Sequence, residues 1–176
     1  MEIVEYQEKY KQYFIALNRA WVEKYFRIEP ADVYTMNNVE KYLEKGGMIF
    51  FAVEGGKAIA TCLIFPIGND VWELSKLAAD ESRHGCGAGS AVFKACLDYA
   101  VGHAAKKITL ESNQLLKPAL HVYEKFGFRR VPLDPDSKYA RADIRFEYAV
   151  PGMNEGRVGA TGSSQCAPPA ESNRHG

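Results

Sequence analysis

The stretch Arg83-His84-Gly85-Cys86-Gly87-Ala88-Gly89-Ser90 (RHGCGAGS) decides the interpretation of this 176-residue sequence. It lies between a strand predicted to end near Ala79 and a helix predicted over residues 91–103, whose first turn starts near Ala88. Glycines let consecutive backbone N–H groups converge, and the N-terminus of a helix adds a partial positive charge. The stretch therefore predicts a phosphate site made by the main chain.

Three phosphate-bearing ligands are compatible with such a loop. A P-loop requires GxxxxGK[ST], and no lysine follows these glycines. A dinucleotide site requires GxGxxG, but Ser90 stands where the third glycine belongs, although Glu111 fits the position of a ribose-binding acid. The third ligand is the pyrophosphate of coenzyme A. An ordinary flexible turn is the alternative without a ligand.

The segments on either side of the loop predict one mixed α/β domain. Upstream, short polar turns separate the apolar runs 48–53, 57–65 and 71–79, which indicates an antiparallel meander. A short edge strand over 2–6 and helices over 8–26 and 30–43 precede it. Downstream, the pattern predicts a strand at 107–111, a helix at 115–126 that Gly127 ends, and strands at 128–131 and 142–150.

The predicted domain covers residues 1–150. Residues 151–176 are rich in glycine, serine and proline and have almost no large apolar side chains. Such a composition buries too little surface to offset the entropy of ordering, so we expect a disordered tail there.

Composition excludes several classes of function. Lysine plus arginine equal aspartate plus glutamate at 22 each, so no basic field favours nucleic acid or an anionic membrane. The four cysteines form no CxxC pair, which argues against a disulfide framework or a metal site, and Cys62 and Cys96 fall in apolar patterns expected in the core. The start, MEIVEYQEKY, has no apolar signal core, and no apolar run reaches about 18 residues. We expect a cytoplasmic protein.

With these residues considered together, the sequence resembles the GNAT superfamily of acetyl-CoA-dependent N-acetyltransferases. The family's pyrophosphate motif, Arg/Gln-x-x-Gly-x-Gly/Ala, matches residues 84–89, with His84 in place of arginine or glutamine and Arg83 one residue earlier. The family's second signature resembles residues 110–113 (LESN) and 119–128 (ALHVYEKFGF). Leu116 stands where many members have an asparagine. The resemblance spans roughly residues 2–150.

The resemblance implies an α/β fold of the α+β type, with a mixed, mostly antiparallel central sheet flanked by helices. In that fold the fourth and fifth strands splay apart. It also implies acetyl-CoA as the acetyl donor, without a metal. The cofactor-binding residues carried over from the family are Leu77, Ala78, Ala79, Arg83, His84, Gly85, Cys86, Gly87, Ala88, Gly89, Ser90, Asn113 and Tyr123.

Acetyl transfer to an amine needs a base for the amine, polarisation of the thioester carbonyl and an acid for the departing thiolate. The resemblance assigns the carbonyl to main-chain N–H groups of residues 77–79, the acid to Tyr123 and the base to Glu73. Strand alternation predicts that Glu73 and Leu77 share one face. Tyr123 as a packed aromatic and Glu73 as a solvated strand residue are the structural alternatives. His121 is expected on the surface.

The acceptor is expected to be the primary amine of a small molecule or a peptide. Trp21, Tyr25, Glu29 and Tyr139 are the candidate acceptor-binding residues, because an aromatic wall with carboxylates suits a cationic amine. Trp21 and Tyr25 also continue a helical repeat with Tyr13 and Leu17, which is typical of core packing. Homodimers are common in the family, and a homodimer is one expectation here. A non-catalytic acyl-CoA-binding module is the alternative function.

Overall fold

The computed structural model describes residues 1–152, and these form one seven-stranded sheet. The strand order is β1-β2-β3-β4-β5-β7-β6, and every neighbouring pair is antiparallel except β4 with β5, which is parallel. The mixed, mostly antiparallel sheet expected from the sequence is confirmed. The strands are β1 (Glu2–Glu5), β2 (Met48–Glu54), β3 (Lys57–Gly68), β4 (Val71–Ala79), β5 (Lys107–Ser112), β6 (Arg129–Val131) and β7 (Ile144–Ala149).

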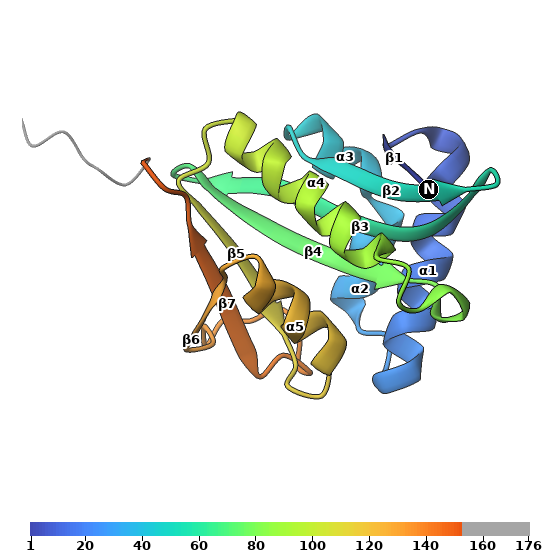
Figure 1. Ribbon diagram of the computed structural model, residues 1–176. Coiled ribbons are helices and arrows are strands. Elements are labelled where there is room, and N and C mark those ends of the chain that lie inside the picture. The colour runs from blue at the N-terminus through green and yellow to red at the C-terminus, as the bar shows by residue number, and fades with distance from the viewer. Residues whose placement is uncertain (153–176) are drawn as a thin grey trace, which may run out of the picture.

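Helices cover both faces of this sheet (Figure 1). On one face lie α1 (Lys11–Tyr25), α2 (Pro30–Asn37) and α3 (Val39–Glu44). On the other lie α4 (Ala88–Gly102) and α5 (Lys117–Lys125), over a core that contains both Cys62 and Cys96, as expected. Two 3-10 turns, Glu8–Tyr10 and Glu81–Arg83, lead into α1 and into the glycine loop. No helix within residues 1–152 combines the length and the apolarity that crossing a membrane requires.

One predicted helix differs from the structure. The single helix expected over 30–43 is two helices, because Asn38 leaves the helical region with φ −129° while its side chain donates to the Tyr34 carbonyl at 2.7 Å. An asparagine side chain that bonds the preceding turn competes with continued helix. The tail expected at 151–176 lies, from residue 153 on, outside the described residues.

Helix α1 buries a different stripe from the one that its aromatic residues suggest. Phe14, Asn18 and Val22 are its buried residues, whereas Trp21 and Tyr25, one position before and three after Val22, are half-buried. The four-residue repeat is therefore real, but it lies beside the buried stripe of the helix and not within it. The displaced face leaves Trp21 and Tyr25 available to line a cavity.

Strands β4 and β5 pair only at their N-terminal ends. The parallel register runs from Val71 opposite Lys107 to Glu73 opposite Thr109, and in the described chain no pair follows. Strand β4 continues for six more residues to Ala79 along β3, while β5 follows β7 (Figure 1). The two strands therefore splay apart, as the family resemblance implies.

A β-bulge in β4 changes which side chains share a face. Between the pairs Leu63–Ser75 and Thr61–Ala78, β4 has one residue more than β3, and Lys76 adopts φ +56°. An extra residue breaks the alternation of side chains along the strand. Trp72 and Leu74 face the α4 side before the bulge, and Leu77 faces that side after it. The expectation that Glu73 and Leu77 share one face is therefore wrong.

Candidate functional site

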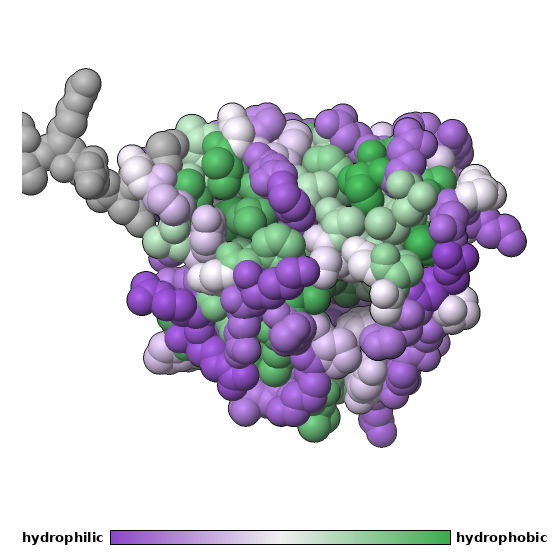
Figure 2. All heavy atoms as spheres, viewed as in Figure 1, coloured by the Kyte–Doolittle hydropathy of each residue, from purple (hydrophilic) through white to green (hydrophobic). Residues whose placement is uncertain are grey.

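A large cavity opens at the end of the splayed strands. Its volume is about 800 Å³, and apolar residues form much of the hollow visible in Figure 2. Helix α1, the end of β4, the glycine loop, the start of α4 and one side of α5 enclose it. The lining residues are Trp21, Lys24, Tyr25, Ile59, Leu77, Ala78, Ala79, Asp80, Glu81, Arg83, His84, Gly85, Cys86, Gly87, Ala88, Gly89, Ser90, Pro118, Ala119, His121 and Val122.

The glycine loop presents backbone N–H groups to this cavity. Gly85 and Gly87 have φ +82° and +81°, values that favour glycine, and a Cβ at either position would meet no atom within 4 Å. Helix α4 begins at Ala88, and the N–H groups of its first three residues precede the first hydrogen bond of the helix, which the Ala91 N–H donates to the Gly87 carbonyl at 3.0 Å. Within the described chain no side chain caps that end. The loop therefore has the free donors and the open space that a pyrophosphate needs.

The other predicted cofactor residues are placed unequally. Leu77, Ala78 and Ala79 line the large cavity together with residues 83–90. Arg83 lies on the rim and forms an ion pair with Glu54. Asn113 lies away from this cavity: its side chain donates to the Arg141 carbonyl at 2.7 Å and accepts from the Leu115 N–H at 2.8 Å. It shapes the turn between β5 and α5.

Among the lining residues that were not expected from the sequence, two carry basic side chains. His121, expected on the surface, and Lys24, which follows the exposed side of α1, both reach the large cavity. They add to the polar side chains of Asp80, Glu81, Arg83 and His84 at a site whose remaining lining is main chain and apolar groups. No sequence signal separates these positions from ordinary surface residues of a helix, because only the folded arrangement of α1 and α5 around the splayed strands brings them to the opening.

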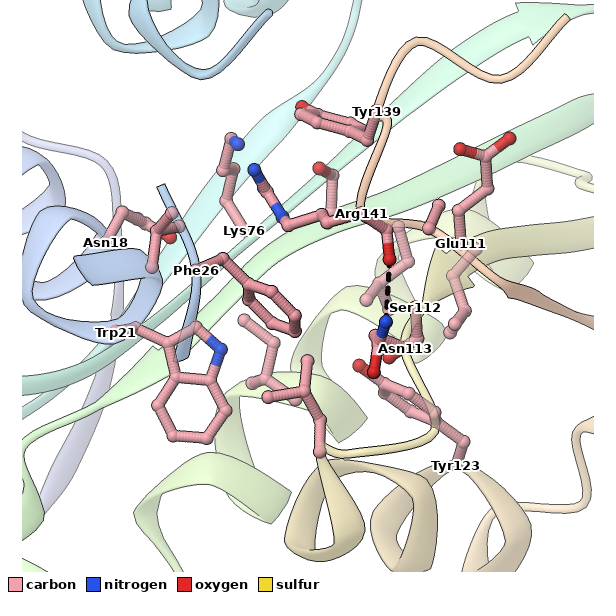
Figure 3. A pocket seen from close by; sticks show the side chains of 17 residues that line it. Asn18, Trp21, Phe26, Lys76, Glu111, Ser112, Asn113, Tyr123, Tyr139 and Arg141 are labelled. Atoms are coloured by element: carbon pink, nitrogen blue, oxygen red, sulfur yellow. Dashed lines mark hydrogen bonds between the residues drawn. The ribbon is translucent and has the colours of Figure 1, made fainter. Parts of the chain in front are cut away.

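A second, smaller cavity of about 90 Å³ lies between α1, the bulged part of β4 and the end of β5 (Figure 3). It shares Trp21 and Leu77 with the large cavity, so the two are neighbours. Tyr123 and Tyr139, both expected in the site, line it. Its lining residues are Asn18, Trp21, Val22, Phe26, Leu74, Ser75, Lys76, Leu77, Leu110, Glu111, Ser112, Asn113, Leu116, Tyr123, Tyr139, Arg141 and Ala142.

Tyr123 is held rigidly at the floor of the small cavity. Its ring centroid lies 5.6 Å from that of Phe93 and 5.3 Å from that of Phe146, and its side chain is only 6% exposed. Burial raises the pKa of the Tyr123 phenol, so this side chain keeps its proton at neutral pH. A protonated hydroxyl in a dry position is the form that a general acid requires.

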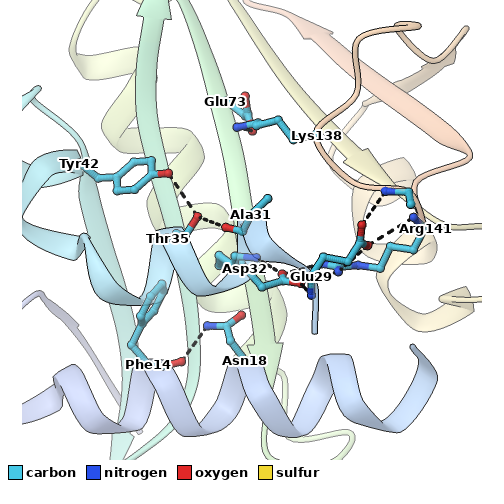
Figure 4. A network of polar contacts seen from close by, with 12 residues as sticks. Phe14, Asn18, Glu29, Ala31, Asp32, Thr35, Tyr42, Glu73, Lys138 and Arg141 are labelled. Carbon is cyan, nitrogen blue, oxygen red and sulfur yellow. Dashed lines mark hydrogen bonds and ion pairs between the residues drawn. The ribbon is translucent and has the colours of Figure 1, made fainter. Parts of the chain in front are cut away.

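The two carboxylates near the splay differ in access. Glu73 lines neither cavity: Lys138 Nζ lies 3.4 Å from its Oε1, and burial raises the pKa of its carboxyl (Figure 4). Glu111 is the one carboxylate among the described residues that line the small cavity, and it accepts a hydrogen bond of 2.6 Å from the Ser137 hydroxyl. Sequence reasoning associated Glu111 only with a nucleotide ribose and missed this placement.

A buried ion cluster forms one wall of the small cavity. Lys76, placed by the bulge, donates to Asp32 Oδ1 at 2.5 Å, and Arg141 makes two bonds to the same carboxylate at 2.6 and 2.7 Å. Glu29 accepts from the Ala140 N–H at 2.7 Å and from Arg141 Nη1 at 3.1 Å (Figure 4). The cluster therefore fastens the loop after β6 to the start of α2. Tyr139 covers both cations, with its ring centroid 4.8 Å from Lys76 Nζ.

The charges in this cluster largely neutralise one another. Burial alone would raise the pKa of Asp32, but the hydrogen bonds from Arg141 and Lys76 outweigh it and hold the pKa at about 2. Burial lowers the pKa of Lys76, and its contact with Asp32 opposes that change. Glu29, expected to attract a cationic acceptor, is instead occupied by Arg141. Of the charged groups that line the cavity, Glu111 is the carboxylate that is not paired with a cation in the described chain.

Comparison with known proteins identifies one family and several structures of similar fold. The model of the acetyltransferase (GNAT) family matches residues 8–128. The fold is similar to that of a GNAT-family acetyltransferase from Staphylococcus aureus Mu50, with a TM-score of 0.76, 19% identity and coverage of 84% of this chain and 98% of that one. It is also similar to an acetyltransferase from Streptococcus agalactiae 2603, with a TM-score of 0.74, 21% identity and coverage of 85% and 98%.

A third similar structure holds a ligand. It is yncA of Salmonella typhimurium, a putative acetyltransferase with its cofactor acetyl-CoA, with a TM-score of 0.68, 14% identity and coverage of 97% of this chain and 98% of that one. A sequence comparison with curated proteins finds no match.

We expect the same substitution, aspartate to asparagine, to lower stability much more in the buried ion cluster than in an exposed ion pair. Asp32→Asn leaves Lys76, only 4% exposed, without its counter-ion, so we expect the free energy of unfolding at pH 7 to fall by about 3–5 kcal/mol. Asp98→Asn breaks the exposed Lys94–Asp98 pair and should cost less than about 1 kcal/mol. Denaturant unfolding monitored by circular dichroism measures both.

The pH dependence of that difference follows from the lowered pKa of Asp32. Because the folded-state pKa is about 2 and the ordinary value is 3.8, the contribution of Asp32 is complete above pH 3.8 and is lost as the pH falls towards 2. An Asp32→Asn variant as stable as the wild type at pH 7 would contradict the proposed role of the cluster.

Proposed function

The chain belongs to the GNAT family of acetyltransferases, and we propose that it transfers the acetyl group of acetyl-CoA to a primary amine of a small molecule or peptide. The observation that carries this proposal is the adjacency of the two cavities. A loop of free backbone N–H groups opens on the large one, Tyr123 and Glu111 line the small one, and Trp21 and Leu77 line both. We place the coenzyme in the first cavity and the reacting amine in the second.

The protein groups around the large cavity suit coenzyme A. The N–H groups of residue 85 and of residues 87–90 would bind the pyrophosphate, whereas the Cys86 N–H already donates to the Arg83 carbonyl at 3.3 Å. This main-chain site does not depend on a basic side chain at position 84. Acetyl-CoA would supply the acetyl group as a thioester. The edge of β4 over residues 77–79, unpaired on the β5 side, leaves N–H groups for the thioester carbonyl. One such donor is typically worth about 3 kcal/mol of transition-state stabilisation.

Two side chains of the small cavity supply the proton transfers. Glu111 would take the proton that the attacking amine loses, directly or through a water molecule. Tyr123 would give its proton to the departing sulfur, which its buried and protonated state favours. Both groups come from elements that flank the splay, β5 and α5. We prefer Glu111 to Glu73 as the base because Glu73 is covered by Lys138 and lines neither cavity.

The small cavity also bears on the class of acceptor. Its volume of about 90 Å³ accommodates an amino group and a short stem rather than a whole large substrate. Lys76 and Arg141 are already paired with Asp32, and Glu111 is the one unpaired carboxylate of the described cavity lining. These charges favour an amine that is not flanked by an acidic group. We expect the reaction in the cytoplasm, where acetyl-CoA is available.

Acetyl transfer predicts release of free coenzyme A that depends on the Tyr123 hydroxyl. Tyr123→Phe should lower kcat about 100-fold and leave the affinity for acetyl-CoA nearly unchanged, because it removes one proton and keeps the ring packing. Chromatography of coenzyme A and mass spectrometry of the acetylated amine, across a panel of amines, measure turnover. Tyr148→Phe removes a hydroxyl outside both cavities and serves as the control. Tight acetyl-CoA binding with no product from any amine would favour the non-catalytic module.

The choice of base predicts a contrast between two glutamates. Glu111→Gln keeps the acceptor for Ser137 but loses the base, so we expect kcat to fall about 100-fold. Glu73→Gln should change kcat less than about threefold. Steady-state kinetics from pH 5 to 10 distinguish them. The reverse result would return the role to Glu73.

A further inference from the structure

Ser112, the last residue of β5, carries a hydroxyl that the fold leaves without a partner. The residue is 8% exposed, and its Oγ makes no hydrogen bond to any described residue. A buried hydroxyl without a partner is unfavourable, so its retention needs an explanation. Ser112 lines the small cavity, where the unpartnered group is available to the reaction.

The neighbour of this hydroxyl is the hydroxyl of Tyr123. Figure 3 shows both side chains at the floor of the small cavity, one from β5 and one from α5. Burial raises the pKa of the Tyr123 phenol, and the Ser112 hydroxyl opposes that rise, which places the two groups within each other's influence. The Ser112 Oγ has no other hydrogen-bond partner among the described residues, so it is free to bond the Tyr123 hydroxyl.

Three other residues around Tyr123 are not available as hydrogen-bond partners of its hydroxyl. Phe93 and Phe146 pack against its ring and have no polar atoms. The thiol of Cys62 is directed to the Ser75 carbonyl, with a sulfur–oxygen distance of 3.6 Å. Of these side chains around Tyr123, Ser112 is the one that carries a hydroxyl without a partner.

We propose that Ser112 is a positioning residue that donates a hydrogen bond to Tyr123 Oη and thereby directs the phenolic O–H towards the departing sulfur. The proposal rests on the proposed function and adds a residue to it. A phenol hydroxyl rotates about its C–O bond, and a donor that occupies the lone pair of the oxygen fixes where its own proton points. The same donor stabilises the phenolate that remains after the proton has left.

Each proton that moves in the proposed step has a donor and an acceptor. The amine nitrogen forms a bond to the carbonyl carbon and gives one proton to Glu111, while the carbon–sulfur bond breaks and its electron pair stays on sulfur. Tyr123 gives its proton to that sulfur, and Ser112 bonds the resulting phenolate oxygen. The proton held by Glu111 then returns to Tyr123 through water. The products are the amide and the free thiol, and both side chains regain their initial state.

A double-mutant cycle tests whether Ser112 acts through Tyr123. Ser112→Ala should lower kcat about 10-fold with KM nearly unchanged, and it should have no further effect in a Tyr123→Phe background, where no phenolic proton remains to be directed. Ser112→Thr, which keeps the hydroxyl, should retain most of the activity. Thermal melting checks that each variant folds.

The alternatives give different results. A 10-fold loss from Ser112→Ala in both backgrounds, or an effect on KM alone, would mean that Ser112 serves packing or the acceptor and would overturn the proposal while leaving acetyl transfer intact. Absence of turnover by the wild type with every amine would instead remove the proposed function, and the role of Ser112 with it.

The contact itself has a readout that is independent of turnover. In protein labelled with carbon-13 at the tyrosine Cζ, the Tyr123 signal is assigned by its absence from Tyr123→Phe. We expect Ser112→Ala to move that signal and Ser112→Thr to leave it near its wild-type position. An unchanged signal in Ser112→Ala would show that the two hydroxyls do not interact and would overturn the proposal.

Discussion

The loss of pairing between β4 and β5 after the Glu73–Thr109 pair is the constraint on which the candidate site depends. Main-chain donors and acceptors that are buried without partners are costly, so two strands that separate inside a sheet must be matched by something else. On the β4 side, residues 77–79 face the large cavity, and on the β5 side residues 110–112 face the small one. A ligand with amide and carbonyl groups can supply the hydrogen bonds that a neighbouring strand would otherwise make.

The bulge and the ion cluster hold this opening in shape. The extra residue at Lys76 reverses the alternation of β4, so that Leu77 turns towards the cavities while Lys76 turns towards α2. There Asp32 ties Lys76 to Arg141, and the loop after β6 is fastened over the small cavity. A buried ion cluster of this kind specifies an arrangement more than it stabilises one. The same bulge therefore connects the coenzyme side of the site with its acceptor side.

The sequence predicted local features well and long-range ones poorly. The glycine loop, the strand segments and Tyr123 follow from turn residues, alternation and motif spacing, all of which act over a few residues. The bulge at Lys76 was not predicted, because no glycine marks it and alternation assumes a regular strand. Glu111, Ser112 and Asp32 were missed for a related reason. Their neighbours come from distant elements, and whether a carboxylate meets a cation or a cavity depends on packing that no single-sequence pattern records.

The proposed function depends on the binding of coenzyme A by the main-chain amides of the glycine loop. A nuclear magnetic resonance titration tests this binding directly. Coenzyme A added to protein labelled with nitrogen-15 should shift most strongly the amide signals of residues 85–90, followed by those of residues 77–79. Saturable shifts confined to another surface, such as the strands β6 and β7, would contradict the account. So would the absence of any shift at saturating coenzyme A.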